Sequence, residues 1–377
     1  MNMSKASHGS GGPWRVAALC FDHMHIGDQI QVVLDHPGAE LVGVFDTDPE
    51  RMARVAGDLG DAESLRYTDH ERCLEETRPD LVVLCPPTAG HEDWALRVAP
   101  YEAHVMVEKP FAGDITGADA MIEAVVGRGR ELAINWPLAW YPSHRTLKRL
   151  IADGVLGDVC ELHFYDGNRG PLFHEHGKKE LDGADPELLA SSWWYRRDAG
   201  GGAMLDYLGY GVTLATWFLD GRIPVDVTTT QFVPEGFEVD VHSIVAARYA
   251  TGLATFQTRW GTFTDPWTTQ PQPGCGFVVA GTKGTATSLD YAPSVRVQTE
   301  ERPEGFDVPT DAMAPHEQTA IAYVLHCLEQ GERVAGPTSW ETSRAGQRIT
   351  DAARRSAERG SAVRLDDVAP QAPGVRG

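Results

Sequence analysis

The strongest constraint on the fold is the alternation of short apolar strands with helices over the first third of the chain. Such strands are buried on both faces, and parallel strands need helical crossovers between them. The residues that follow the first strand show the helical period, with Ile26, Ile30, Val33 and Leu34 on one face. The pattern predicts a doubly wound parallel sheet in an α/β domain, with strands at 15–19, 39–46, 80–87, 104–110 and 131–137.

From about Trp136 the pattern changes. A helix is predicted over 144–153, and longer strands of alternating apolar and polar residues follow it. Hairpin-like turns at 250–252 and 282–284 separate some of these strands. They predict an α+β domain with a large, mostly antiparallel, open-faced sheet. The expected parts are a disordered tail (1–13), a first domain (14–135), a second domain (136–337) and a final helix (338–365) that packs back on the first domain.

Length and charge narrow the possible functions. A chain of 377 residues is long enough for two domains. The net charge of −21 argues against nucleic acid or an anionic membrane as a partner. No apolar run approaches the roughly 20 residues of a membrane span. The polar, Gly/Ser-rich start has no apolar core of a signal peptide, which favours the cytoplasm.

The cysteines and histidines give no clear metal motif. The six cysteines lie far apart without a CxxC pair, and Cys85 and Cys160 fall in apolar strand-like runs. Buried thiols in a reducing compartment are therefore expected, and a structural zinc site is not. The His-Glu-His run at 174–176 has no third spaced ligand, so solvated side chains are expected there.

The turn after the first predicted strand is unusual. A phosphate-cradling turn carries Gly-x-Gly-x-x-Gly, but the equivalent places hold Cys20, Asp22 and His25. Glycines allow a tight turn and let backbone N–H groups approach a pyrophosphate. The Asp22 carboxylate would repel a diphosphate unless a cation lay between them. His23 and His25 could offset that charge or donate ring N–H groups to phosphate oxygens.

Asp46 favours a dinucleotide. It ends the second predicted strand, where an acid hydrogen-bonds the adenosine ribose hydroxyls and repels a 2′-phosphate. Thr47 and Asp48 stand beside it, with no arginine. The sequence therefore predicts NAD as the cofactor, in preference to NADP. The alternative is that Asp46 only caps the end of its strand.

Three stretches in this order resemble the glucose-fructose oxidoreductase and inositol dehydrogenase family, often written Gfo/Idh/MocA. They are VEKP at 107–110, GGGAMLDYLGY at 200–210 and GTKGT at 281–285. The resemblance extends from about residue 14 to 365. It implies a Rossmann domain that binds NAD or NADP, and a second domain that presents a sugar or cyclitol for hydride transfer.

The resemblance also implies roles for three residues. Lys109 matches the family's catalytic lysine, Asp206 matches its aspartate, and Tyr210 stands where the family usually has histidine. Asp206 and Tyr210 are four residues apart and share one face of a helix. A phenol with a pKa of about 10 is a poor base at neutral pH, but a nearby ammonium would lower that pKa. Either Tyr210 relays the proton, or it only packs and Lys109 alone moves the proton.

Further contacts are predicted around these groups. Substrate contacts are expected from the stretch before the triple glycine, although domain packing is the alternative for its tryptophans. These substrate-binding residues are Asn168, Arg169, Trp193, Trp194 and Tyr195. The predicted cofactor-binding residues are Phe21, Asp22, His23, Met24, Asp46, Pro86, His91, Glu108, Lys109 and Asn135.

The sequence thus predicts an NAD-dependent oxidoreductase that acts on a secondary alcohol of a sugar, glycoside or cyclitol. A lyase or hydrolase that recycles bound NAD internally is one alternative, and a cofactor-free binding or regulatory homologue is the other. An antiparallel sheet with one uncovered face commonly packs against another subunit. A homo-oligomer, dimer or tetramer, is therefore expected, with a small molecule as the substrate.

Overall fold

The computed structural model describes residues 12–56, 62–183 and 186–368, so most of the expected tail lies outside the described residues. The chain divides into two compact units. Unit 1 comprises Met1–Asn135, His174–Asp182 and Ala314–Trp340. Unit 2 comprises Trp136–Phe173, Gly183–Met313 and Glu341–Gly377.

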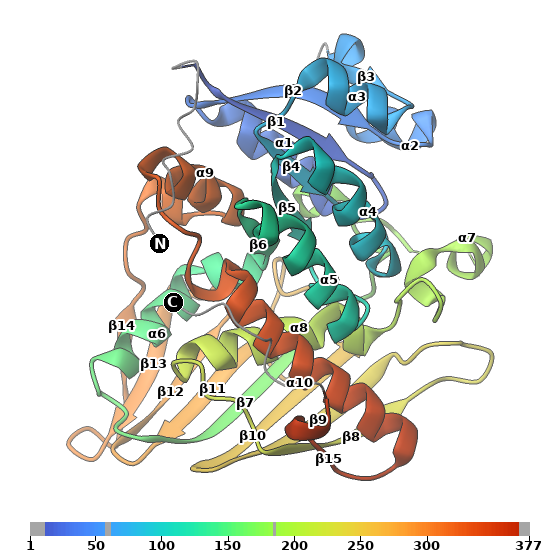
Figure 1. Cartoon of the computed structure of the whole chain (residues 1–377). Helices are drawn as coiled ribbons and strands as arrows, with labels where there is room; N and C mark the ends of the chain where they lie inside the picture. Colours follow the sequence, from blue (N-terminus) through green and yellow to red (C-terminus); the bar gives the residue numbers. More distant parts are fainter. Residues whose placement is uncertain (1–11, 57–61, 184–185, 369–377) are drawn as a thin grey trace. The chain divides into compact units, whose positions relative to one another are not determined.

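Unit 1 is built on a six-stranded sheet in the order β3-β2-β1-β4-β5-β6, and all its strand pairs are parallel. This confirms the predicted doubly wound fold. The helices α1 (His25–Asp35) and α9 (Ala320–Gln330) pair on one face, and α4 (His91–Val98) and α5 (Ile115–Val125) pair on the other (Figure 1). The strands are β1 (Trp14–Leu19), β2 (Ala39–Phe45), β3 (Arg66–Tyr67), β4 (Leu81–Leu84), β5 (His104–Glu108) and β6 (Leu132–Asn135).

The helices of unit 1 bury apolar stripes against this sheet. In α1, Ile26, Ile30 and Val33 are buried as predicted, but Leu34 is 46% exposed. The expected stripe was one residue too wide, because α1 meets β1, β2 and β4 along a narrower face. The helices are α1 (His25–Asp35), α2 (Pro49–Ala56), α3 (His70–Thr77), α4 (His91–Val98), α5 (Ile115–Val125) and α9 (Ala320–Gln330).

Unit 2 is built on a nine-stranded sheet in the order β14-β13-β12-β11-β7-β10-β9-β8-β15. Only the pair of β7 and β10 is parallel among these strands, so the sheet is mostly antiparallel as predicted. The strands are β7 (Val159–Asn168), β8 (Asp226–Phe232), β9 (His242–Tyr249), β10 (Gly252–Trp260), β11 (Gly276–Gly281), β12 (Gly284–Leu289), β13 (Ser294–Thr299), β14 (Phe306–Pro309) and β15 (Val363–Arg364).

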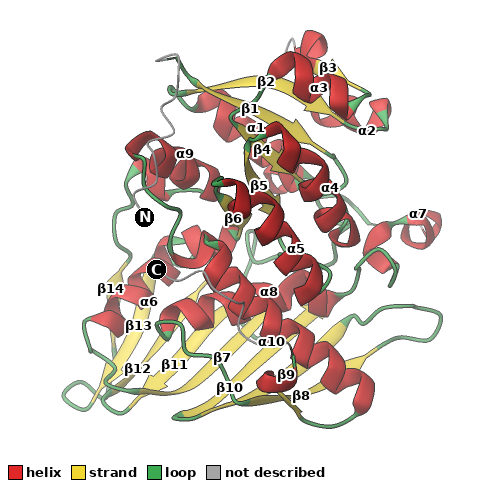
Figure 2. Cartoon of the chain, viewed as in Figure 1, coloured by secondary structure: helices red, strands yellow, loops and turns green. Residues whose placement is uncertain are grey.

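Three helices cover one face of this sheet, namely α6 (Pro142–Ala152), α8 (Ala203–Phe218) and α10 (Trp340–Arg359) (Figure 2). A fourth, short helix is α7 (Pro186–Ser191). α8 packs on β7, β9 and β10. Its Gly211 allows that close approach, since a Cβ there would lie 2.4 Å from Cδ1 of Phe164.

The final helix groups with unit 2 from Glu341 onward, and its packing on the first domain stays a prediction. Within unit 2, Ser343 Oγ accepts a hydrogen bond from the indole of Trp136, and Ser356 Oγ accepts one from the backbone of Thr229. Segments 174–182 and 314–340 group instead with unit 1.

All six cysteines are free thiols. Five of them are buried, but Cys160 is exposed, so the expected burial of Cys160 was wrong. It lies near the start of β7, where Cys160 and Glu161 both face solvent. Among the described residues, no helix is both long enough and apolar enough to span a bilayer.

Candidate functional site

The carboxyl end of β5 carries the predicted lysine. Lys109 directly follows the strand and is 4% exposed. Glu108 beside it is buried; its Oε2 accepts a hydrogen bond of 2.7 Å from the amide of Asn135, at the end of β6. Its Oε1 lies 2.9 Å from Nδ1 of His25. The structure therefore brings together three of the predicted cofactor residues, Glu108, Lys109 and Asn135, and adds His25 from the turn after β1.

Glu108 is an ionised carboxylate in a buried place. Burial by itself raises its pKa, but the His25 ring, the Lys109 ammonium and the Asn135 amide outweigh burial, and the pKa lies below its usual value. Burial lowers the pKa of His23 well below its usual value, and the neighbouring His25 ring and Lys109 ammonium act in the same direction. His23 is therefore a neutral imidazole near pH 7.

The turn between β1 and α1 keeps the backbone of a glycine turn without the glycines. Cys20 takes the first glycine's place with φ of 69°, in the left-handed region. The first backbone N–H groups of α1 have partners inside the turn. His25 N–H donates to Nδ1 of His23, Ile26 N–H to the His23 carbonyl, and Gly27 N–H to the Met24 carbonyl, each at 3.2 Å.

Asp46 lies at the end of β2, as predicted, and is 1% exposed. Its Oδ2 accepts hydrogen bonds from the Phe21 backbone (2.6 Å) and from Nε of Arg51 (3.0 Å). Its Oδ1 accepts from the Asp48 backbone and from Nη2 of Arg51, both at 2.7 Å. The expectation that no arginine stands beside Asp46 was wrong, because the first turn of α2 brings Arg51 back to the end of β2.

Arg51 also holds Asp22, the carboxylate in the second glycine's place, at 2.7 Å. Burial raises the pKa of Asp22 to about 6, although Arg51 acts in the opposite direction. Asp48 precedes α2 and caps it, since its Oδ1 accepts from the Glu50 and Arg51 backbones. One guanidinium therefore bridges two carboxylates, those of Asp22 and Asp46.

A second segment of unit 1 covers the first turn of α1. The His176 side chain packs on Gly27, where a Cβ would lie 2.8 Å from Cβ of His176. The Gly177 backbone donates a 2.7 Å hydrogen bond to Oδ1 of Asp28. His174 and His176 are half-buried, so the expectation of solvated side chains in the 174–176 run was wrong. Their contacts depend on tertiary structure that their own sequence does not show.

These residues fit a dinucleotide with a changed phosphate cradle. Arg51 supplies two of the four donors on Asp46 and is partly exposed, so its release would leave one free acceptor site on each carboxylate oxygen for two ribose hydroxyls. On the pyrophosphate side, the backbone N–H groups of His25, Ile26 and Gly27 are already bonded, and the rings of His23 and His25 lie in the same turn.

The other predicted cofactor residues lie around this turn. His91 is buried, and its ring lies between the carbonyl oxygens of Pro86 (3.3 Å) and Phe111 (3.2 Å). Burial lowers its pKa. His91 therefore ties together the loops that follow β4 and β5. Met24 immediately precedes α1.

Asp206 and Tyr210 belong to unit 2 and lie one turn apart in α8, both buried. Oδ2 of Asp206 accepts a hydrogen bond of 2.9 Å from the indole of Trp260, and the Tyr210 ring meets Trp136 edge-on at 5.5 Å. The sequence analysis missed Trp260. The signal was present, because alternate residues of β10 are buried and Trp260 continues that face.

The predicted substrate residues of unit 2 have partners within the unit. Oδ1 of Asn168 accepts from the Gly170 backbone, and Arg169 forms an ion pair of 2.6 Å with the buried Asp265. Trp193 and Trp194 stack at 3.9 Å. Tyr195 packs against Trp260 at 5.1 Å, so it adjoins the group that holds Asp206.

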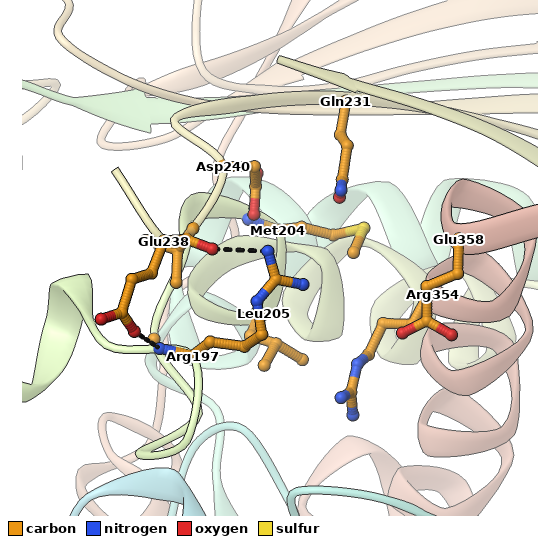
Figure 3. Close-up of a pocket in the computed structure, with 10 residues that line it drawn as sticks. Arg197, Met204, Leu205, Gln231, Glu238, Asp240, Arg354 and Glu358 are labelled. Atoms are coloured by element: carbon orange, nitrogen blue, oxygen red, sulfur yellow. Dashed lines mark hydrogen bonds between the residues drawn. The ribbon is translucent and has the colours of Figure 1, made fainter. Parts of the chain in front are cut away.

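Figure 3 shows a pocket of unit 2 beside the start of α8. Arg197 and Glu238 meet on one side, where the Arg197 guanidinium donates to the Glu238 carbonyl at 2.6 Å. Arg354 of α10 stands on the other side. Asp240 lies in the wall, and Oδ2 of this residue accepts from the Met204 backbone at 3.0 Å. This pocket was not predicted from the sequence.

The parallel sheet of unit 1, with an acidic residue at the end of β2, defines a protein of the dinucleotide-binding α/β class. The comparisons with known families agree. A model described as an oxidoreductase family with an NAD-binding Rossmann fold matches residues 25–136, and a model of the GFO/IDH/MocA C-terminal domain matches residues 144–287. The chain belongs to the GFO/IDH/MocA oxidoreductase family.

Two curated relatives and one solved structure illustrate the similarity. A dTDP-3,4-didehydro-2,6-dideoxy-alpha-D-glucose 3-reductase of Streptomyces antibioticus is 28% identical over 190 residues, 50% of this chain and 52% of that protein. Inositol 2-dehydrogenase 4 of Saccharopolyspora erythraea is 32% identical over 127 residues, 33% of this chain and 37% of that protein. The chain thus matches about half or less of these relatives' length.

The solved structure is that of an inositol dehydrogenase homolog complexed with NAD+ from Azotobacter vinelandii. Its TM-score is 0.76 at 15% sequence identity, and the match covers 94% of this chain and 98% of that one. The likeness extends over both units and shows that they share this family's fold.

Proposed function

We propose that this protein is an NAD-linked dehydrogenase that moves a hydride between the nicotinamide and a secondary alcohol carbon of a sugar, glycoside or cyclitol. The observation that carries the proposal is the buried Lys109 immediately after β5, at the sheet edge where doubly wound folds bind ligands. The relatives named for inositol and for a deoxysugar support the substrate class.

Bound NAD supplies the hydride acceptor. The alcohol must also lose its hydroxyl proton, and charge develops on its oxygen as it does so. The Lys109 ammonium hydrogen-bonds that oxygen and stabilises the charge. Asp206, held by the Trp260 indole, orients Tyr210 or a substrate hydroxyl. Tyr210 either relays the proton or packs against the substrate, and the variants below separate these two roles.

We also propose a preference for NAD over NADP. Arg51 is one positive charge among the carboxylates of Asp22, Asp46 and Asp48. The excess of negative charge repels the additional phosphate of NADP. Titration of the protein with each dinucleotide, followed by tryptophan fluorescence, measures this preference.

A homo-oligomer and a cytoplasmic location complete the proposal. The face of the nine-stranded sheet opposite α8 exposes Ile244 and Leu253 on neighbouring strands. Burial of such side chains against a second copy favours association. Six free thiols suit a reducing compartment. Sedimentation of the purified protein measures the number of subunits.

The decisive experiment replaces Lys109. In Lys109→Ala, turnover with a panel of polyols should fall by about 10²–10⁴-fold, while NAD affinity stays within a few-fold of the parent. Lys283→Ala, which removes an exposed lysine from the turn between β11 and β12, is the matched control. Unchanged turnover in Lys109→Ala would overturn the proposal. Tyr210→Phe loses a comparable factor only if the phenol carries the proton.

A further inference from the structure

Three metal-ligating side chains converge at the carboxyl edge of the sheet of unit 1. His23, His25 and Glu108 each offer one ligand atom, and the three atoms lie within 4.8 Å of one another. No other group of three such residues occurs in the part of the chain that the structure describes. We propose that His23, His25 and Glu108 form a binding site for a divalent transition-metal ion.

The carboxylate is already oriented for such an ion. The Glu108 side chain is fully buried, and the Asn135 amide holds its Oε2. The other oxygen, Oε1, therefore faces the imidazoles, 2.9 Å from Nδ1 of His25. Metal sites commonly hold their ligands by an outer hydrogen bond of this kind. A buried carboxylate beside two imidazoles thus presents both the charge and the orientation of a ligand.

The two rings can close around one ion with a small movement. Their centroids are 4.4 Å apart, and the His23 ring is fixed by a 3.2 Å hydrogen bond from the His25 backbone, which is long for such a bond. In a tetrahedral site with Zn–N distances of about 2.0–2.1 Å, neighbouring ligand atoms lie about 3.3–3.4 Å apart. The three ligand atoms, which lie within 4.8 Å of one another, must therefore approach by up to about 1.4 Å. The His25 side chain is 21% exposed, which leaves it room to turn.

The donor set selects the kind of ion. Two imidazole nitrogens and one carboxylate oxygen suit Zn²⁺, Co²⁺ or Ni²⁺, whereas Mg²⁺ and Ca²⁺ prefer all-oxygen sites. Three protein ligands also leave a coordination position for water or another ligand.

The test uses the full-length protein without any dinucleotide, so its outcome does not depend on the proposed dehydrogenase activity. After dialysis against a chelator, Co²⁺ and Zn²⁺ are titrated separately, by visible absorption for Co²⁺ and by calorimetry for both. We expect one ion per chain, a Co²⁺ absorption band typical of mixed nitrogen and oxygen ligands, and no displacement of Co²⁺ by millimolar Mg²⁺.

Variants identify the ligands. His25→Ala and Glu108→Gln should each weaken binding at least tenfold. His25 is partly exposed, so its variant keeps the test valid if replacement of the buried Glu108 prevents folding. The matched control is His316→Ala/His326→Ala, which removes a stacked pair of rings 3.9 Å apart elsewhere in unit 1. The proposal is overturned if no ion binds, if both ligand variants bind as the parent does, or if only the control variant loses binding.

Discussion

Replacement of Asp240 by asparagine tests how burial controls a carboxylate at the start of α8. Asp240 is 6% exposed and lines the pocket of unit 2 (Figure 3). Its side chain accepts a hydrogen bond from the Met204 backbone, and its carbonyl accepts one from the Ala203 backbone. Burial raises its pKa from 3.8 to about 7, and the charge of Asp206 adds to this effect. The Met204 N–H group opposes the shift without cancelling it.

The sign of the pH dependence follows from linkage. Between about pH 4 and pH 7 the folded chain keeps a proton on Asp240 that the unfolded chain has lost. Stability therefore falls as the pH rises through that window. A pKa shift of about 3 units corresponds to about 4 kcal/mol. Asparagine does not titrate, and its amide oxygen can still accept from Met204, so Asp240→Asn lacks this fall.

The assay is urea unfolding at several pH values between 4 and 8, read by hydrogen exchange of α8 amides, which reports unit 2 alone. The stability of Asp240→Asn relative to the parent should increase by about 4 kcal/mol over this range. Glu238→Gln removes an exposed carboxylate from the same pocket and controls for the loss of one charge. A stability difference that does not change with pH, or that equals the difference for Glu238→Gln, would refute the reasoning.

Two further predictions concern groups at the candidate sites. Asp46→Asn should destabilise unit 1 by about 2–4 kcal/mol in urea unfolding. The amide replaces one acceptor oxygen by an NH₂ group, which cannot accept from the donors of Phe21, Asp48 and Arg51. Asp48→Asn keeps the oxygen that begins α2 and should cost only a few tenths of a kcal/mol; equal losses would contradict this account. Trp260→Phe leaves Oδ2 of Asp206 without its indole donor, so unit 2 should lose about 1.5–3 kcal/mol. An unaltered unfolding midpoint would show that the hydrogen bond contributes nothing.

The order of strands and helices could be predicted because it depends on local patterns. Continuous apolar runs marked the parallel strands, and glycine turns marked the hairpins at 250–252 and 282–284. The errors concern single positions at the margins of elements. Leu34 lies outside the narrow face along which α1 meets the sheet, and Cys160 lies near the start of β7, where two successive residues face solvent. Periodicity shows which face is apolar, but it does not show how far the covering element extends.

The candidate site was predicted only in part. Lys109, Glu108 and Asn135 end neighbouring parallel strands, so a sheet of that order had to bring them to one edge. The partners of these groups were harder to find. Arg51 reaches Asp46 only because α2 turns back over the end of β2. Trp260 belongs to β10 and Asp206 to α8, two elements that lie 54 residues apart along the chain at this contact.

The sequence by itself determined the two-part architecture and the identity of the residues at the edge of the parallel sheet, since both follow from spacing along the chain. Only the tertiary structure decided which charges and donors these residues meet. Glu108 turns one oxygen toward His25 because Asn135 holds the other. His176 packs on Gly27, and the neighbouring Gly177 donates a hydrogen bond to Asp28, which lies 149 residues away along the chain. Such contacts depend on directional hydrogen bonds and close packing between distant segments, and no period or motif in the sequence records them.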